Sequence, residues 1–435
     1  MMPFASFHMR DRLFFWTSTI AALVLNPLES NAGPEVVQIA TLPRTSLQAF
    51  LPDETEWTQT ARRNGLNALD LPSIGSGLAR VGTNEFIGIT DRGPNFTVTK
   101  TGDEERRIFP LPKFAPAIVR FKLAGDTLNL LQVITLRGQD GKPLTGLSNG
   151  DGEEPCYESA RSKAPLPFDV GGVDPEGIRV LPDGRFLVSE EYGPSLLLVE
   201  TNGVVLARYT PQDKPLKGAP YPVKPILPAV LSKRRDNRGF ESVALSADGK
   251  TAYVMLQSAA IGKPKKKFND SRVSRVVRLD VSEPLNARVT GHFLMPLHAA
   301  SEFTVAQKQT NVKLNDAEWI GQDKLLVLEQ AKGEARLLVA DFSQATNLLD
   351  RTDENELSFE AAGGDLSQLK VTPARVETWF STKQVNTIDS DKLEGLAIVG
   401  PQEIALVNDN DFGTGDNKTG QPSTFWLIRV NRPMP

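Results

Sequence analysis

The sequence predicts an all-β protein, a β-propeller built from four-stranded blades. The stretch from Asp174 to Thr210 reads as four short apolar strands joined by tight turns, which is the size of one blade. Weaker copies of its first hairpin recur along the chain, while helix-type periodicity is sparse. Five copies are visible and a sixth is possible, so we expect five or six blades.

The stretch from Asp174 to Thr210 defines the expected blade. Its strands are predicted at residues 177–181, 185–190, 196–200 and 204–210. The turns between them contain Pro-Asp-Gly at 182–184, Gly-Pro-Ser at 193–195 and Asn-Gly at 202–203. Proline presets φ, and glycine and asparagine accept the left-handed angles of tight hairpins. Neighbouring strands should therefore run antiparallel, as a meander.

Copies of the first hairpin set the expected blade positions. They run over residues 77–91, 176–190, 241–257, 318–329 and 394–409. Outer strands are expected at 117–123, 128–136, 273–281, 289–297, 335–342 and 424–430. The segment from Val36 to Ala40 is expected to add a strand to the last blade, which would cover an otherwise exposed sheet edge.

The amino terminus has the pattern of an export signal. Arg10 and Arg12 precede the apolar run from Leu13 to Leu25, and small residues end at Ala32. We expect a signal peptide at 1–32, a single propeller domain at 33–435, and a secreted or periplasmic protein. A buried amino-terminal helix is the alternative. The mature chain has no apolar run of the roughly 20 residues that a membrane span requires.

Charge and cysteine content exclude several classes of protein. The net charge of −4 gives no general attraction to nucleic acid. Cys156 is the single cysteine, so no intrachain disulfide can form. The mature chain contains only two histidines, His292 and His298. A site with a cysteine nucleophile or a zinc cluster is therefore not expected. We expect a monomer that acts on a small molecule.

Hairpin geometry predicts where the chemistry lies. Glu176 begins the first strand of its hairpin and Glu190 ends the second, so both lie opposite the turn, on strands about 4.8 Å apart. Repetition about an axis should gather the corresponding acids of the other hairpins at the same rim. Crowded carboxylates need cations, and Ca²⁺ prefers oxygen ligands of this kind. The alternative is that arginines and backbone N–H groups satisfy these acids as structural groups.

These arguments give three sets of candidate residues. The candidate catalytic residues are Glu176, Glu190 and Glu241. The candidate substrate-binding residues, which lie beside the acids, are Arg92, Arg238 and Tyr192. The candidate calcium ligands are Asp91, Asp174, Glu191, Glu318, Glu329, Glu394, Asp409 and Asp411. Residues 408–413 place oxygen donors at alternate positions, as a calcium loop does, and an Asx-stabilised turn explains them nearly as well.

Six short motifs occur in order: DPEGI, EEYGP, NRGFES, VLEQ, EGLA and NDNDFG. As an ordered set, from about Thr90 to Phe412, they resemble the exported phytase-like propeller family that is described as having esterase-like activity. The resemblance implies a β-propeller fold and the hydrolysis of phosphate or other esters.

The leading hypothesis from the sequence is a calcium-dependent ester hydrolase that acts on phosphomonoesters. In it, Arg92 and Arg238 would hold phosphate oxygens, and bound calcium would activate water. One alternative is a calcium-dependent lactonase or carboxylic esterase with an acid such as Glu176 as the base. The other is a propeller without enzymatic activity that binds a ligand or a protein.

Overall fold

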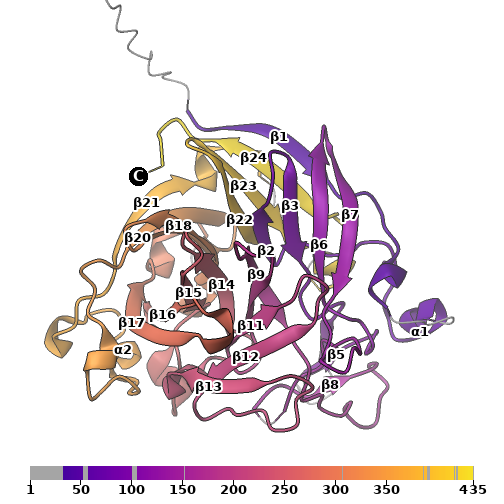
Figure 1. Ribbon diagram of the computed structural model, residues 1–435, viewed down its shortest axis with the longest axis horizontal. Coiled ribbons are helices and arrows are strands. Elements are labelled where there is room, and N and C mark those ends of the chain that lie inside the picture. Colours follow the sequence, from indigo (N-terminus) through magenta and orange to yellow (C-terminus); the bar gives the residue numbers. More distant parts are fainter. Residues whose placement is uncertain are drawn as a thin grey trace, which may run out of the picture. The chain divides into compact units, whose positions relative to one another are not determined.

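The computed structural model describes residues 33–51, 57–99, 105–150, 152–305, 307–385, 387–388, 392–415, 417 and 420–434. The signal peptide expected at residues 1–32 lies outside the described residues. Residues 33–435 cluster into one compact unit whose regular elements are mostly strands (Figure 1). The prediction of an all-β protein is confirmed.

Most strands belong to five groups of four that are consecutive antiparallel neighbours. The first group is β2 (Gly77–Arg80), β3 (Glu85–Ile89), β6 (Ala117–Ala124) and β7 (Thr127–Thr135). The second is β9 (Pro175–Val180), β10 (Phe186–Glu190), β11 (Ser195–Val199) and β12 (Val205–Pro211). The third is β14 (Phe240–Leu245), β15 (Thr251–Leu256), β16 (Val273–Asp280) and β17 (Arg288–Pro296).

The last two groups complete the arrangement. The fourth group is β18 (Lys313–Gly321), β19 (Lys324–Ala331), β20 (Glu334–Asp341) and β21 (Arg375–Ser381). The fifth is β22 (Leu393–Gly400), β23 (Glu403–Asn408), β24 (Thr424–Arg429) and β1 (Glu35–Thr41). The strand β1 comes from the start of the unit and pairs antiparallel with β24, which confirms the pairing expected for residues 36–40. A single parallel pair, Thr41 with Thr127, joins the fifth group to the first.

The first strands of the five groups are mutual neighbours. Strand β2 contacts β9 and β22, β14 contacts β9 and β18, and β18 contacts β22. In Figure 1 these strands lie toward the middle, while the last strands β7, β12, β17, β21 and β1 lie further out. Each group therefore presents the beginning of its first strand to the same inner region.

Apolar clusters fill the spaces between successive groups, because both faces of most strands are buried. On β10, Leu187 packs toward the third group and Val188 toward the first, as the alternation of side chains along a strand requires. Two further clusters join the third group to the fourth and the fourth to the fifth. A fifth cluster, with Phe86 and Phe425 in edge contact, joins the first group to the last.

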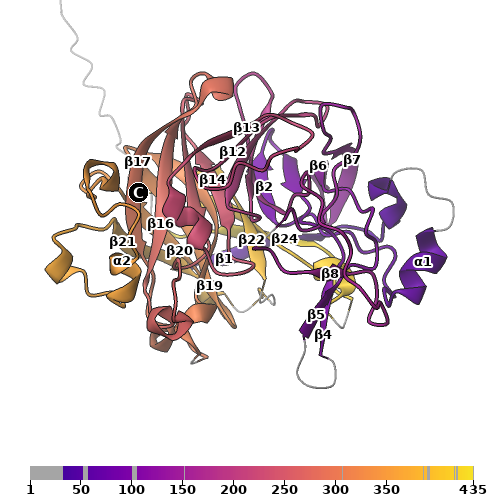
Figure 2. The same cartoon turned by 90° about the horizontal axis from the view of Figure 1, so that it is seen from below.

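A few elements lie outside the five groups. Strand β13 (Val223–Leu227) adds a parallel edge to β12. A small sheet contains β4 (Phe96–Thr99), β5 (Glu105–Ile108) and β8 (Cys156–Tyr157). Figure 2 shows the β4–β5 hairpin extending away from the other sheets. The helices α1 (Trp57–Arg63) and α2 (Ser358–Ala361) are short, and no helix among the described residues is long and apolar enough to cross a membrane.

Candidate functional site

Strand register brings two residues from each group to corresponding inner positions. The pairs Gly77 with Ile89, Gly177 with Ser189, and Gly395 with Val407 occupy the same place in their hairpins. The first residue lies at or next to the start of the first strand of its hairpin, and the second lies at or just after the end of the second strand. We call the resulting set the inner ring: Ser76, Asp91, Glu176, Glu191, Glu241, Gln257, Asn315, Gln330, Glu394 and Asp409. All ten are polar and buried.

Glycines allow the inner strands to approach closely. A Cβ atom on Gly177 would lie 2.5 Å from Ser189 Oγ and 2.9 Å from the carbonyl oxygen of Glu241. A Cβ atom on Gly77 would lie 2.7 Å from the Cα atom of Gly177. Real side chains do not make contacts this short. The glutamate-glycine sequence at the start of the hairpin thus has two roles. The glutamate supplies the acid, and the glycine allows the close strand packing that brings the acids together.

Three acids come together in what we call the carboxylate cluster: Asp174, Glu176 and Glu191. Each offers an oxygen atom within 4.8 Å of those of the other two, and all three side chains are buried. Glu191 Oε2 is buried without a hydrogen-bond partner, and the side chain of Glu176 makes no hydrogen bond or ion pair with any described residue. Such a group of oxygens is compatible with a metal ion.

The acids of the inner ring strongly affect each other's ionisation. Burial raises the pKa of Glu176 well above its usual range, and the charge of Glu241 adds to this. Burial also raises the pKa of Glu241, with the charges of Glu191 and Glu394 acting in the same direction. Glu191 differs: burial raises its pKa, but the charges of Arg92, Arg234 and Arg238 and a hydrogen bond with Asp174 together outweigh burial, so the pKa of Glu191 is lowered. The region thus holds more negative charge than its own cations balance.

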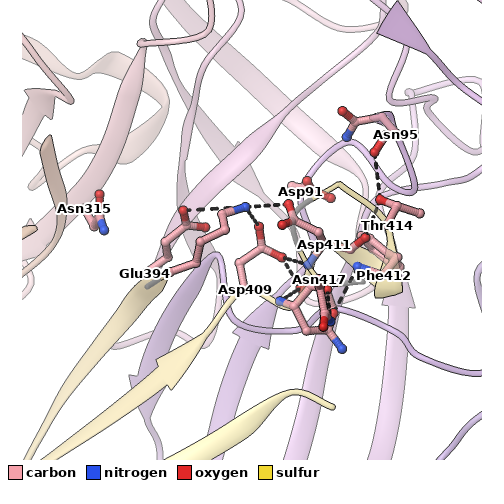
Figure 3. Close-up of polar contacts among 12 residues, drawn as sticks. Asp91, Asn95, Asn315, Glu394, Asp409, Asp411, Phe412, Thr414 and Asn417 are labelled. Carbon is pink, nitrogen blue, oxygen red and sulfur yellow. Dashed lines mark hydrogen bonds and ion pairs between the residues drawn. The ribbon is translucent and has the colours of Figure 1, made fainter. Parts of the chain in front are cut away.

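A lysine balances the acids of the fifth group. The ammonium group of Lys392 lies 2.6 Å from Asp411 Oδ1 and 3.9 Å from Glu394 Oε1, and it also donates to Asp409 (Figure 3). We call these four residues the lysine cluster. The calcium-loop interpretation of residues 408–413 therefore needs revision, since an ammonium group already lies between the two aspartates. Asp411 and Phe412 have φ near +50°, as in a tight Asx-stabilised turn.

The substrate-binding candidates differ in their surroundings. Arg92 lies 3.2 Å from Asp174 Oδ2 and donates to Asn237, so it braces the carboxylate cluster. The hydroxyl of Tyr192 donates to the carbonyl oxygen of Gly146 at 2.8 Å, and the side chain is buried. Both side chains are thus buried and held by other parts of the chain.

Arg238 is the least buried of the three substrate-binding candidates. Its side chain is half-buried and donates to the neutral amide of Gln257 at 2.6 Å. Burial lowers the pKa of Arg238, whereas Glu241, Glu191 and Glu394 raise it. Its guanidinium thus faces the inner-ring acids without an ion pair among the described residues.

Three predicted acids lie outside the inner ring. Glu190 accepts hydrogen bonds from Arg208 and Ser195, and burial raises its pKa to about 7. Glu329 accepts from the backbone N–H of His298 at 2.9 Å. The inner positions are held by Glu191, which was also predicted as a calcium ligand, and by Gln330, which was not predicted, because successive side chains point to opposite faces.

Glu318 was misplaced for a different reason. It lies 3.5 Å from Arg179, and burial raises its pKa to about 7. Strand β18 begins earlier than predicted and has a register shift between Leu314 and Ala317. Asn315 therefore holds the position that corresponds to Glu176.

A polar cleft of about 1300 Å³ reaches the inner ring at Asn315, Gln330 and Glu394. Its charged lining is mainly basic: Arg44, Arg107, Lys313, Lys332 and Lys392, against the acids Glu394 and Asp411. Lys313 and Lys332 make no ion pair with any described residue. Sequence reasoning missed Lys313 and Lys392, although Lys392 directly precedes the Leu-Glu-Gly start of the last hairpin. The cleft suits a ligand with negative charge.

A family model described as "Phytase-like: Esterase-like activity of phytase" matches residues 74–412. The chain belongs to this family. The match confirms the resemblance found in the six ordered motifs. The family description names an esterase-like activity.

One curated relative is described as an "Uncharacterized secreted protein" of Arthroderma benhamiae. It is 31% identical over 184 residues, which is 36% of this chain and 35% of the relative. The chain thus matches about a third of that protein's length.

Two solved structures are similar over most of the chain at low identity. The PQQ-bound aldose sugar dehydrogenase of Streptomyces coelicolor is 12% identical, with a TM-score of 0.34, and covers 84% of this chain and 97% of its own. The calcium-binding protein regucalcin of Agrobacterium tumefaciens is 12% identical, with a TM-score of 0.33, and covers 84% and 93%. Likenesses this weak carry no argument about the activity of this chain.

Proposed function

We propose that residues 33–435 form a single five-bladed β-propeller. Each group of four strands would be one blade. Support comes from the neighbour relations of the five first strands, in which β2 contacts both β9 and β22, and from the five apolar clusters between successive groups. The pairing of β1 with β24 would complete the last blade with a strand from the start of the unit.

We infer that the protein is a divalent-cation-dependent ester hydrolase, with Ca²⁺ as the cation and phosphomonoesters as the substrates. The observation that carries this proposal is the carboxylate cluster. Glu176 has no ion pair among the described residues, and Glu191 has a buried oxygen without a partner. Burying carboxylates without compensation is costly, so the cluster requires protons or a cation.

The residues fit a calcium ion. Asp174, Glu176 and Glu191 would hold it, since all three offer oxygen atoms and calcium takes six to eight oxygen ligands, water included. A bound divalent cation lowers the pKa of a coordinated water and offsets the negative charge of an ester. Asp91, in which burial and the charge of Asp409 raise the pKa, lies at the edge of the same charged region.

Two further residues would act on the substrate directly. Arg238 would bind an anionic oxygen of the ester, because its guanidinium faces the acids and is bonded only to a neutral amide. Glu241 would accept the proton of the attacking water, since it makes no hydrogen bond or ion pair with a described residue and burial raises its pKa.

The cleft favours an anionic ester over a neutral one. Five basic side chains line it against two acidic ones, and Lys313 and Lys332 have no acidic partner among the described residues. Attraction of this kind raises the local concentration of a phosphorylated substrate.

We also propose that the protein is exported and that residues 1–32 are its signal peptide. The support is the pattern of basic residues, apolar run and small residues at 1–32 together with the relative described as secreted. The amino-terminal sequence of protein recovered outside the cytoplasm tests this proposal, and cleavage near Ala32 is expected.

An activity assay tests the enzymatic proposal. Chelator-treated protein is expected to hydrolyse a phosphomonoester only after Ca²⁺ is restored. Glu176→Gln should abolish the activity, because it removes one charged oxygen ligand. Asp183→Asn is the matched control, since Asp183 lies at the hairpin turn of the same sheet and is paired with Arg185.

The same assay separates the other two functions. Calcium-dependent cleavage of lactones or carboxylic esters, without cleavage of phosphomonoesters, would favour a lactonase or carboxylic esterase function. A protein that binds calcium and cleaves none of these substrates above the Glu176→Gln background would be a binding propeller.

A further inference from the structure

The acids around the inner ring form two clusters that differ in their supply of positive charge. The lysine cluster has an ammonium group in contact with all three of its acids, Glu394, Asp409 and Asp411. The carboxylate cluster has one ion-paired cation among the described residues, Arg92, which forms an ion pair with Asp174 but with neither Glu176 nor Glu191. We propose that Lys392 takes the place of a second metal ion, so that the protein binds a single divalent cation, at the carboxylate cluster.

The lysine cluster is already complete. Asp409 Oδ1 accepts from Ser73 Oγ at 2.5 Å and from the backbone N–H of Asp411 at 2.8 Å, and its Oδ2 accepts from Lys392. Asp409 is 4% exposed, so its oxygens have these partners in place of water. A divalent cation could enter only by displacing the ammonium group, which is tethered to the chain and already contacts all three acids.

The carboxylate cluster is incomplete by the same criteria. Glu191 is 1% exposed and its Oε2 has no hydrogen-bond partner. Glu176 has neither a hydrogen bond nor an ion pair within the described part of the chain. The side chain of Glu241 also makes no hydrogen bond or ion pair with a described residue, and its charge raises the pKa of Glu176. Three carboxylates thus make no ion pair with a described residue, whereas each acid of the lysine cluster contacts Lys392.

The pairing of one ion with one lysine has a consequence for the substrate. Enzymes that cleave phosphate esters with two metals hold them about 3.5–4 Å apart, and each ion stabilises one of the reacting oxygens. Here Lys392 lines the cleft and would supply the second positive charge toward the same anionic group. This consequence rests on the proposed function, but the number of bound ions does not.

Ion counting on the wild-type chain is the first test. Chelator-treated protein is titrated with Ca²⁺ by calorimetry, and the metal content after dialysis is measured by elemental analysis. One ion per chain is expected. Two or more ions, or none, would overturn the proposal.

A variant supplies the second test. Lys392→Met removes the ammonium group while keeping a side chain of similar length, so Glu394, Asp409 and Asp411 become a second group of unpaired carboxylates. Two ions per chain are expected in this variant, and one ion in the double variant Lys392→Met with Asp409→Asn. Lys332→Met, which removes another lysine of the cleft, should leave one ion. A single ion in folded Lys392→Met would contradict the proposal.

These outcomes are separable from the fate of the proposed function. If Lys392→Met does not fold, the ion count of the wild-type protein still decides. An active hydrolase with two ions would overturn this inference and leave the proposed function standing. A protein that binds one ion and has no hydrolytic activity would support this inference and overturn the proposed function.

Discussion

Glu190 and Glu191 are adjacent in the chain, and their carboxylates have different partners. Glu190 is buried between strands, where Arg208 and Ser195 donate to it. Glu191 belongs to the carboxylate cluster with Asp174 and Glu176. Since successive side chains of a strand point to opposite faces, one residue of register separates a structural ion pair from a candidate ligand.

Substitution of these two neighbours should therefore have opposite effects. Glu190→Gln leaves the fully buried Arg208 without its counter-charge and should lower the free energy of unfolding by about 3–5 kcal/mol, with or without calcium. Glu191→Gln removes one repelling charge, so the calcium-free protein should keep its stability while losing its response to calcium. Urea unfolding of both variants in chelator and in Ca²⁺ checks this. Equal destabilisation by the two changes would contradict it.

Gly177 is expected to be a packing residue. A Cβ atom there would lie 2.5 Å from Ser189 Oγ and 2.9 Å from a backbone oxygen, so Gly177→Ala must push two inner strands apart. We expect a loss of about 1–3 kcal/mol of stability and weaker calcium binding, because the strand that carries Glu176 moves. Gly400→Ala, on β22, is the control, since its nearest contact would be an ordinary 3.7 Å. The prediction fails if the two variants unfold at the same urea concentration.

Much of this fold could be predicted from the sequence because hairpins are encoded locally. Tight turns and short apolar runs predicted the strands of the second group to within a few residues. Strand β21 was missed, since more than thirty residues separate it from its partner β20 and no turn signal links them.

The site was less predictable than the strands. The repeat places an acid near the end of each second strand, but a pattern of residue types does not decide between Glu190 and Glu191. In the fourth group the register shift between Leu314 and Ala317 displaced the repeat, so that Glu318 was chosen in place of Asn315. Lys392 lies just before β22, outside the repeated pattern. Its contact with Asp409 depends on how the start of β22 approaches the end of β23 in space, which the sequence pattern does not show.

Arg238 should distinguish anionic from neutral substrates. Arg238→Met should lower kcat/KM for a phosphomonoester about 10- to 100-fold, because a charge-assisted hydrogen bond contributes about 1.5–3 kcal/mol. Hydrolysis of a neutral ester should change little. The control is Arg235→Met, since Arg235 donates to the carbonyl oxygen of Phe268 instead of facing the acids. Equal losses on charged and neutral esters would exclude the proposed role of Arg238.

Calcium should stabilise the protein more as the pH rises. Burial raises the pKa of Glu394 from 4.5 to about 7, and it raises the pKa of Glu176 and Glu241 in the same direction. Without metal, these protonated carboxyl groups stabilise the folded state fully at a pH below the pKa that they have in the unfolded chain. That stability is lost as the pH rises through the higher pKa that they have in the folded chain. Calcium competes with the protons at Glu176, so the stabilisation by calcium should be small near pH 5 and large near pH 8.

Thermal unfolding at several pH values, in chelator and in Ca²⁺, measures this difference. A calcium-induced shift as large at about pH 5 as at about pH 8 would show that the ion does not bind at carboxylates with raised pKa values.

The central claim is that the carboxylate cluster holds a divalent cation, and the melting temperature of the wild-type chain and of Glu176→Gln, each with and without Ca²⁺, tests it most directly. At a free calcium concentration one hundred times the dissociation constant, binding adds about 2.7 kcal/mol to the stability of the folded state. The wild-type protein should therefore melt a few degrees higher in calcium, and Glu176→Gln should melt at the same temperature in both conditions. A wild-type melting temperature that calcium leaves unchanged at neutral pH, together with loss of stability in Glu176→Gln, would show that these acids are structural groups and would contradict the account.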